Sequence, residues 1–249
     1  MQGLKLASQS SHRTIILPHI IKYLPRNYKV ASTDAEVKVY GFDLDHTLIK
    51  PKLGGRFSRT ADDWTFMAYQ GNSSTENGCK TIDTMTDILK QDPNSLIVIF
   101  SNQGGVITHP PNSKSCIKFT SKISQVLDAI VDLHTDIENR IWIYASTKKP
   151  ASLSTVKRNK MATKKVVKKG SGLKEVKQQM AVLDDDCFLS VRKPMPGLYE
   201  EFKKDFGASF ELQYYCGDAA GRPQDFSDSD KLFAQAIGCC FRTPEEIFS

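Results

Sequence analysis

Four short, almost continuous apolar segments are the feature that most restricts how this chain can fold. They are rich in β-branched and aromatic residues, and they read VKVYGF from Val37, SLIVIF from Ser95, RIWIYA from Arg140 and LQYYCG from Leu212. Strands with apolar side chains on both sides are typical of parallel sheets that are covered on both faces. Stretches with helical periodicity lie between these segments, at about 80–91, 117–134, 196–206 and 230–237. The alternation predicts an α/β fold with a mostly parallel sheet and helices on both faces.

The length and the N-terminal segment indicate one domain that is not inserted in a membrane. A chain of 249 residues can bury a sizeable core, and we expect residues 1–249 to form a single domain. No run approaches the roughly 18 apolar residues of a membrane span. Residues 1–25 lack the pattern of a secretory signal, and we expect them to form a folded edge segment. A mitochondrial presequence is the alternative, because this segment contains no acidic residue.

Residues 147–177 have a different composition from the rest of the chain. They hold eleven Lys and Arg against one acid, Glu175, a net charge of +10 that leaves −4 of the total +6 for the remaining residues. The segment shows no periodicity, so we interpret it as a flexible basic insertion within the domain. A solvated surface, a nuclear import signal and a non-specific DNA-binding element all remain open.

Polar residues follow three of the predicted strands at the point where each strand ends. Asp43 and Asp45 follow the first, Ser101 and Asn102 the second, and Asp218 the last. In open α/β sheets, ligands bind outside the carboxyl ends of the strands. Burying unpaired carboxylates costs several kcal/mol, so a compensating charge is expected there. Mg²⁺ prefers oxygen ligands and suits such a set.

These groups favour phosphoryl transfer to an aspartate. Asp43 would attack phosphorus, and Asp45 would protonate the leaving oxygen and later activate water. Mg²⁺ would lie between Asp43, the backbone carbonyl of Asp45 and Asp218.

Two further groups would bind the phosphoryl oxygens. The Ser101 hydroxyl is one, with Asn102 beside it. Lys193, in the sequence VRKPMPG, would supply positive charge.

The motifs resemble those of a known family. DLDHT, FSN, RKP and GD followed by Asp230 resemble, in order, the four motifs of haloacid-dehalogenase-like phosphatases. FDLDHTLI, DDWTF, IVIFSNQGGV, RKPMPGLYE, GDAAGRPQDFSDSDKLFA and FRTPEEIF resemble, more narrowly, the phosphatase domain of the polynucleotide kinase 3′-phosphatase family over about 40–245. The resemblance implies a haloacid-dehalogenase-like Rossmannoid fold. The 53 residues between Thr47 and Ser101 are filled by a loop and one helix, so we expect no large cap domain there. The resemblance also implies a Mg²⁺-dependent enzyme that removes 3′-phosphates from DNA ends during strand-break repair.

The same resemblance implies the roles of the residues that match the motifs. Asp43 is the expected nucleophile, Asp45 the acid and base, and Ser101 and Lys193 the phosphoryl binders. The implied metal set is Asp43, Asp45 and Asp218. The implied substrate and the basic insertion together favour a nuclear location, and we expect a monomer.

Two features depart from the family pattern. His46 stands where such motifs often have a small residue. The spacing G-x-x-x-x-G-K-[ST] of a phosphate-binding loop is absent from the sequence, so no kinase activity is expected. The chain therefore resembles the stand-alone 3′-phosphatases of fungal type.

Some residues near the motifs have more than one open interpretation. Arg192 and Arg222 would contact DNA backbone phosphates, or they would form surface salt bridges. Thr47 and Asp230 would support the metal site, whereas Asp230 could also cap the following helix.

Two other functions remain as alternatives. One is a small-molecule phosphatase acting on histidinol phosphate or a sugar phosphate, although the six cysteines show no Cys/His set at zinc spacing. The other is a non-catalytic protein that binds DNA ends.

Overall fold

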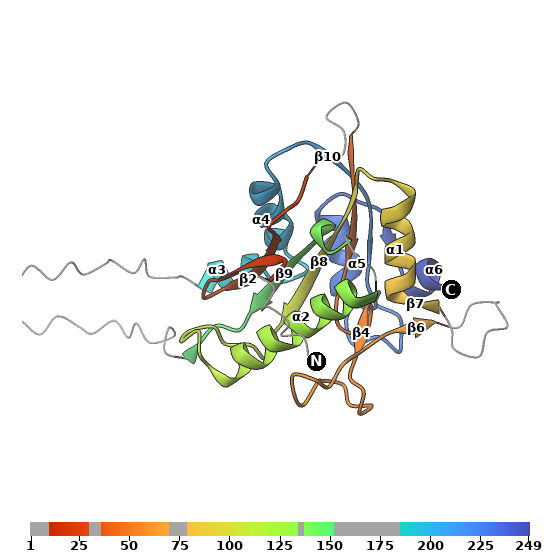
Figure 1. Ribbon diagram of the computed structural model, residues 1–249. Helices are drawn as coiled ribbons and strands as arrows, with labels where there is room; N and C mark the ends of the chain where they lie inside the picture. Colours follow the sequence, from red (N-terminus) through yellow and green to blue (C-terminus); the bar gives the residue numbers. More distant parts are fainter. Residues whose placement is uncertain (1–9, 30–35, 70–78, 134–136, 152–184) are drawn as a thin grey trace, which may run out of the picture.

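A seven-stranded sheet forms the centre of the computed structural model, which describes residues 10–29, 36–69, 79–133, 137–151 and 185–249 (Figure 1). Its strand order is β1-β2-β9-β8-β3-β10-β11. The strands are β1 (His12–Ile16), β2 (Ile20–Pro25), β3 (Val37–Phe42), β8 (Ser95–Gln103), β9 (Ile141–Thr147), β10 (Phe210–Cys216) and β11 (Phe241–Arg242). Neighbouring strands from β9 to β11 run parallel, whereas β1 pairs with β2, and β2 with β9, in antiparallel fashion.

The four predicted strands are confirmed as β3, β8, β9 and β10, and with them the mostly parallel α/β fold. In the structure β8 extends to Gln103, so Ser101 and Asn102 lie within the C-terminal end of this strand rather than after it. Residues 152–177 of the predicted basic insertion lie outside the described residues.

The N-terminal segment forms the antiparallel edge of the sheet. Residues 10–25, the described part of the predicted edge segment, contain β1 and β2. The charged Lys22 interrupts the apolar pattern of β2, yet its side chain is buried because its Nζ donates to Glu201 at 2.6 Å and to Asp205 at 2.8 Å. Pairing with a helix that lies far along the chain therefore makes this lysine compatible with a buried strand.

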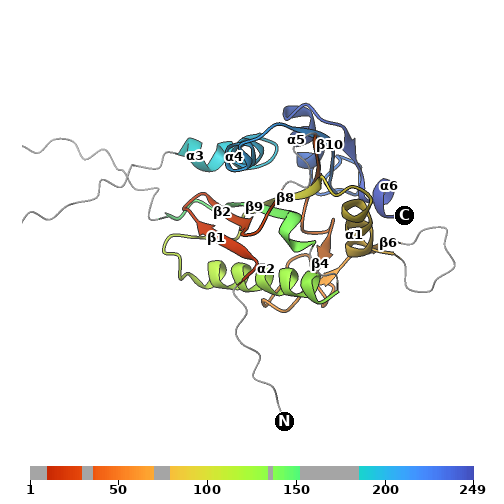
Figure 2. The ribbon, with the colours of Figure 1, turned by 45° about the horizontal axis from the view of Figure 1, so that its top comes forward.

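The helices form two layers, one on each face of the sheet (Figure 2). One layer holds α3 (Asp185–Ser190), α4 (Gly197–Phe206) and α5 (Ser229–Ala236); the other holds α1 (Thr81–Gln91), α2 (Lys114–Leu133) and the short α6 (Pro244–Phe248). A 3₁₀ turn, η1 (Glu138–Arg140), precedes β9. The four predicted helices are α1, α2, α4 and α5. In α2, the buried Ile123, Val126, Leu127 and Ile130 follow the predicted spacing of three and four residues.

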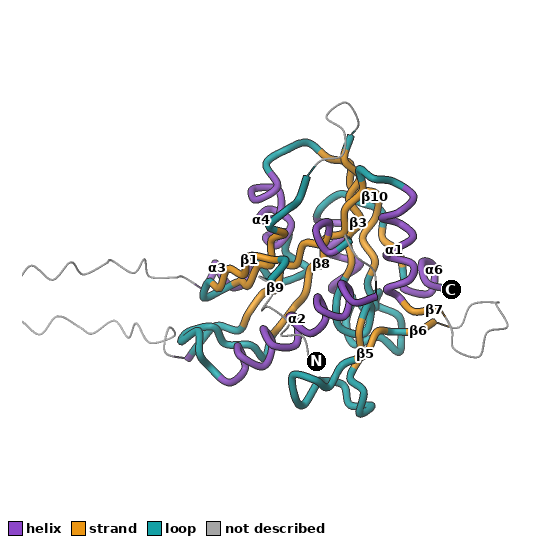
Figure 3. Tube along the Cα trace, viewed as in Figure 1, coloured by secondary structure: helices purple, strands orange, loops and turns teal. Residues whose placement is uncertain are grey.

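The stretch of chain between β3 and α1 forms two small sheets (Figure 3). They pair β4 (Ile49–Lys50) with β5 (Thr65–Phe66) and β6 (Ala68–Tyr69) with β7 (Cys79–Lys80). In the described part of residues 47–101, the chain forms the two small sheets, α1 and most of β8, and it forms no large cap domain. None of the helices in the described part of the chain is long and apolar enough to cross a membrane.

An aromatic cluster joins the sheet to α4 and α5. The ring of Phe202 on α4 packs edge-on against Phe100 of β8 and Trp142 of β9, with centroids 6.3 and 5.8 Å apart. The ring of Phe233 of α5 also packs against Phe100, with centroids 5.4 Å apart. Rings in such edge-to-face contacts add stability beyond the area that they bury.

The substitution Phe202→Ala should lower the free energy of unfolding by about 3–5 kcal/mol, because the side chain is fully buried and leaves a cavity. Urea unfolding followed by circular dichroism measures this loss. The exposed Ile117 of α2 provides the control, since Ile117→Ala should change the same quantity by only about 0.5 kcal/mol. Equal losses in the two variants would contradict the assignment of this cluster as the core.

Candidate active site

The topology brings the predicted site residues to one edge of the sheet. From β3 the chain passes to β8 and β9 on one side and later to β10 on the other, so β3 lies at the switch point of the strand order. In α/β sheets this point opens a crevice for ligands at the carboxyl ends of the strands. Asp43 directly follows β3, and Asp218 comes two residues after β10.

The ammonium group of Lys193 lies at the centre of this edge. Lys193 comes from the turn between α3 and α4, and only 2% of its side chain is exposed. Its Nζ donates to Asp43 Oδ1 at 2.5 Å, to the Tyr215 hydroxyl at 2.7 Å and to Asp230 Oδ1 at 2.8 Å. Burial lowers the pKa of Lys193, but the carboxylates of Asp230 and Asp43 outweigh it and raise the pKa overall. The lysine is therefore charged.

Three carboxylates converge on this lysine. Asp43, Asp218 and Asp230 each offer one oxygen, and these oxygens lie within 4.8 Å of one another. Burial raises the pKa of Asp43 well above its ordinary value; Lys193 opposes this shift, while Asp230 and Asp218 add to it. Burial and Asp230 also raise the pKa of Asp218. One ammonium group does not compensate the whole cluster, which leaves it suited to a further cation.

The donor set fits Mg²⁺, which binds one or two carboxylates and keeps water or phosphate oxygens in its other positions. Asp43 and Asp218 are the carboxylates with the freer oxygens. Both oxygens of Asp230 already accept hydrogen bonds, Oδ1 from Lys193 and Tyr215 and Oδ2 from the Ala219 N–H at 3.0 Å. Asp230 thus supports the site by orienting Lys193 and the chain next to Asp218.

The helix-cap interpretation of Asp230 is wrong. The N-cap of α5 is Asp228, and Asp230 lies inside the helix with 2% exposure. Its carboxyl group packs directly against Gly217, where an added Cβ would come within 2.4 Å of it. The absence of a side chain at Gly217 therefore allows Asp230 to reach the site.

The carboxylate of Asp45 turns away from the cluster. Its Oδ1 accepts from Lys122 Nζ of α2 at 3.0 Å, and its Oδ2 accepts from Gln103 Nε2 at 2.6 Å. Its side chain is 35% exposed, compared with 10% for Asp43. Its carboxylate is therefore accessible to solvent, and its role as acid and base stays a prediction. The predicted contact of its backbone carbonyl with the metal stays a prediction.

Thr47 and His46 shape the loop after β3. The buried Thr47 hydroxyl accepts a hydrogen bond from the Asp218 N–H at 3.0 Å, which supports its predicted place beside the metal set. His46 has a φ of 65°, a left-handed conformation that favours small or polar residues. Its Nε2 contacts the Arg56 carbonyl at 2.8 Å. The unusual histidine is therefore accommodated by a contact with the loop that follows.

Ser101 and Asn102 have different surroundings. Ser101 Oγ is buried and accepts from Gln103 Nε2 at 2.8 Å, next to the contact between Gln103 and Asp45. The amide of Asn102, predicted to bind phosphate, instead holds the backbone of Lys193: Nδ2 donates to the Lys193 carbonyl at 3.0 Å, and Oδ1 accepts from its N–H at 2.9 Å. The side chain of Asn102 thus positions Lys193 rather than a phosphoryl oxygen.

The two arginines predicted to contact DNA also differ. Arg222 donates to Asp225 and Glu245, at 2.9 and 3.1 Å, which is the surface salt-bridge alternative. Arg192 is exposed, and its guanidinium lies over Gly104, where an added Cβ would come within 3.1 Å of Nη1. Arg192 thus borders the loop after β8, and its contact with DNA stays a prediction.

Sequence reasoning missed Gln103, Lys122 and Tyr215. Gln103 directly follows the FSN motif, so its position was a usable signal. Lys122 and Tyr215 carry no local signal, because they reach Asp45 and Lys193 only through the packing of α2 and β10.

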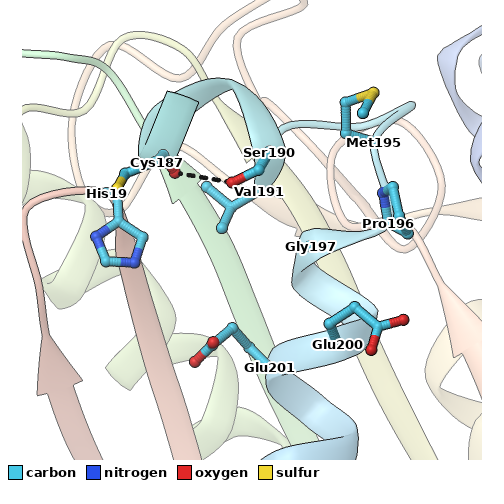
Figure 4. A pocket seen from close by; sticks show the side chains of 9 residues that line it. All are labelled: His19, Cys187, Ser190, Val191, Met195, Pro196, Gly197, Glu200 and Glu201. Atoms are coloured by element: carbon cyan, nitrogen blue, oxygen red, sulfur yellow. Dashed lines mark hydrogen bonds between the residues drawn. The ribbon is translucent and has the colours of Figure 1, made fainter. Parts of the chain in front are cut away.

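A separate pocket of about 370 Å³ lies beside α3 and α4 (Figure 4). His19, Cys187, Met195, Glu200 and Glu201 are among the residues that line it. None of the predicted site residues belongs to its lining.

Comparison with known proteins decides which family these residues represent. A family profile described as "Polynucleotide kinase 3 phosphatase" matches residues 38–248, a range that contains all the predicted site residues. The chain belongs to this family. The resemblance inferred from the motifs is thereby confirmed.

Similar proteins match most of the chain. "Polynucleotide 3'-phosphatase" of Saccharomyces cerevisiae is 40% identical over 253 residues, which cover 96% of this chain and 99% of that protein. "Bifunctional polynucleotide phosphatase/kinase" of Schizosaccharomyces pombe is 32% identical over 213 residues, which cover 85% of this chain and 37% of that protein. A solved structure of D,D-heptose 1.7-bisphosphate phosphatase from B. bronchiseptica, complexed with magnesium and phosphate, gives a TM-score of 0.46 at 15% identity, covering 82% of this chain and 79% of that one.

For this family member, we predict that Gly217→Ala displaces Asp230, because the new Cβ would overlap its carboxyl group. Since Asp230 orients Lys193, kcat for phosphatase turnover should fall about a hundredfold. Gly105→Ala is the matched control, because a Cβ at Gly105 meets nothing within 4 Å. If Gly217→Ala kept full activity, the proposed support by Asp230 would be refuted.

We also predict that Asp218→Asn raises the midpoint of thermal unfolding at pH 7 in the presence of a chelator. Burial and Asp230 raise the folded-state pKa of Asp218 above that of the unfolded chain, so ionisation costs stability as the pH rises through this range. The difference from the wild type should shrink below about pH 4, where both states become protonated. Differential scanning calorimetry across pH measures it. A lower midpoint at pH 7 would contradict the predicted repulsion.

Proposed function

We propose that this protein is a Mg²⁺-dependent polynucleotide 3′-phosphatase that acts on DNA ends in strand-break repair, through an aspartyl-phosphate intermediate and without kinase activity. The observation that carries the proposal is the buried contact between Asp43 and Lys193 at the switch point of the sheet, in a chain that belongs to this phosphatase family. The names of the relatives support the substrate class.

Asp43 is the nucleophile in this proposal. Its carboxylate is held at 2.5 Å from Lys193 Nζ, which fixes its orientation and stabilises its ionised form. A terminal phosphoryl group entering beside Asp43 meets the buried Ser101 hydroxyl as a donor, and the positive charge of the Lys193 ammonium group stabilises its oxygens. Asp43 attacks phosphorus in line with the ester oxygen, the P–O ester bond breaks, and the phosphoryl group is left on Asp43.

Asp45 moves the protons. It donates a proton to the 3′ oxygen as the ester bond breaks, and it then removes a proton from the water that hydrolyses the aspartyl phosphate. Gln103 and Lys122 hold its carboxylate at the solvent side of the site, where the 3′-hydroxyl leaves. The second step restores Asp43 and releases inorganic phosphate.

Mg²⁺ would be held by Asp43 and Asp218, with the Asp45 carbonyl as a further predicted ligand. When bound, it supplies positive charge that lets a phosphate dianion approach the carboxylates.

The location and the oligomeric state of the protein are inferred from the sequence. A nuclear location agrees with a DNA substrate and with the eleven Lys and Arg of residues 147–177. A monomer suffices for the mechanism, because the residues assigned to it all lie in one chain.

The substitution Asp43→Asn should abolish turnover of a 3′-phosphate-ended oligonucleotide and leave the fold intact, because Asn is isosteric but cannot form the acyl phosphate. The exposed Asp87 of α1 gives the matched control Asp87→Asn, which should retain activity. Phosphate release and circular dichroism check both results. Retained activity in Asp43→Asn would refute the nucleophile assignment.

The substrate class is tested with a 3′-phosphate-ended oligonucleotide, a 5′-phosphate-ended one and a sugar phosphate, each with Mg²⁺ and with a chelator. Only the first should be turned over well, and only with Mg²⁺. Failure on the 3′ end, or preference for the sugar phosphate, would overturn the proposed function.

A further inference from the structure

A lysine lies on the buried face of α2, where the helix packs against the sheet. Lys122 is 6% exposed. Its neighbours on this face follow the spacing of three and four residues, and they are Cys116, Phe119, Ile123, Val126, Leu127 and Ile130. Lysine is almost never buried in this way unless its charge is paired, so an apolar residue is the expected occupant of this position. A buried charge at this place therefore needs a specific partner.

The partner of Lys122 is the carboxylate of Asp45. Lys122 Nζ donates to Asp45 Oδ1 at 3.0 Å, and within the described residues this is the ion pair that the lysine forms. The ring of Phe119, whose centroid is 5.7 Å from Nζ, borders the same ammonium group. An apolar side chain at this position would pack in the core without the cost of burying a charge. The contact with Asp45, and not the packing of α2, therefore explains the lysine.

Gln103 continues this contact toward the expected phosphoryl site. Its Nε2 donates to Asp45 Oδ2 at 2.6 Å and to Ser101 Oγ at 2.8 Å. Ser101 and Gln103 are two positions apart on β8, so their side chains lie on the same face of the strand. A row of hydrogen-bonded side chains thus runs from the buried face of α2, through Asp45, to the hydroxyl that is expected to bind a phosphoryl oxygen.

This row fixes the orientation of the Asp45 carboxylate. Each of its oxygens accepts a hydrogen bond, one from Lys122 and one from Gln103, so a rotation of the carboxylate loses at least one of them. A general acid must lie within hydrogen-bond reach of the leaving oxygen, and a fixed orientation removes the entropic cost of finding that place. Because Lys122 contributes a full charge, its contact is the stronger of the two supports.

We infer that Lys122 is a positioning residue for the proposed acid and base, and that it holds the Asp45 carboxylate beside Ser101, on the side where the ester oxygen leaves. This inference rests on the proposed function. In each turnover Asp45 gives a proton to the 3′ oxygen as the P–O ester bond breaks, and it regains one from the water that hydrolyses the acyl phosphate. Lys122 keeps its own protons throughout and acts through Asp45.

The substitution Lys122→Met removes the charge and keeps an apolar side chain of similar length on the buried face of α2. The single-turnover rate constant on a 3′-phosphate-ended oligonucleotide should fall about thirtyfold, because a sugar alkoxide leaves poorly without a well-placed proton donor. Release of nitrophenolate from p-nitrophenyl phosphate in a single turnover should change less than about twofold, because nitrophenolate leaves without a proton. Excess enzyme and rapid quenching give both rate constants.

The matched control is Lys90→Met, which changes an exposed lysine in the last turn of α1 and should leave both rate constants at the wild-type value. Circular dichroism checks that both variants fold. An unchanged rate constant on the oligonucleotide in Lys122→Met would overturn the inference. Equal losses on the two substrates would also overturn it, because they would show a general disturbance of the site.

A double-variant cycle shows whether Lys122 acts through Asp45. In Asp45→Asn, which retains residual activity without the acid, adding Lys122→Met should change the rate constant on the oligonucleotide less than about twofold. The double variant removes both charges of the pair, so it leaves no uncompensated charge in the core. A further thirtyfold loss would overturn the inference. A wild type that is inactive on every 3′-phosphate end would instead refute the proposed function, so the two failures are distinct.

Discussion

The buried contact of Lys193 with Asp43 and Asp230 is the interaction on which the site depends. Breaking a buried ion pair by removing one partner costs about 3–5 kcal/mol, since the other charge is left uncompensated. The sheet and one of the two helix layers contribute to this contact: β8 through Asn102, β10 through Tyr215 and α5 through Asp230. The same contact orients the nucleophile. The packing of the sheet and its helices is therefore linked directly to the chemistry.

Exposure increases from the nucleophile to the acid and base. Asp43 and Lys193 are buried, whereas Asp45 is partly exposed. A buried carboxylate beside an ammonium group is protected from competing water, which suits an attack on phosphorus. A partly exposed acid suits the release of a hydroxyl group.

Much of the fold could be predicted because its signals are local. The strands around Val39, Val98 and Ile143 are continuous apolar runs, and the residues that follow them carry the motifs. The contacts that hold the site residues in place could not be predicted so fully, because they join segments that are distant in the sequence. Lys122 reaches Asp45 across 77 positions of sequence, and Asp230 reaches Lys193 across 37. The strands β1 and β2 were predicted only as an edge segment, because the pairing of β2 with β9 also joins distant segments.

The central claim is that the phosphoryl group passes through Asp43. The direct measurement is a short reaction with a 3′-phosphate-ended oligonucleotide, quenched in acid and reduced with borohydride, followed by mass spectrometry of the peptides. Reduction of an acyl phosphate on Asp43 converts that residue to homoserine, so we expect homoserine at position 43. It should be absent when the oligonucleotide ends in a 3′-hydroxyl. Homoserine at another aspartate, or at none during active turnover, would contradict the account.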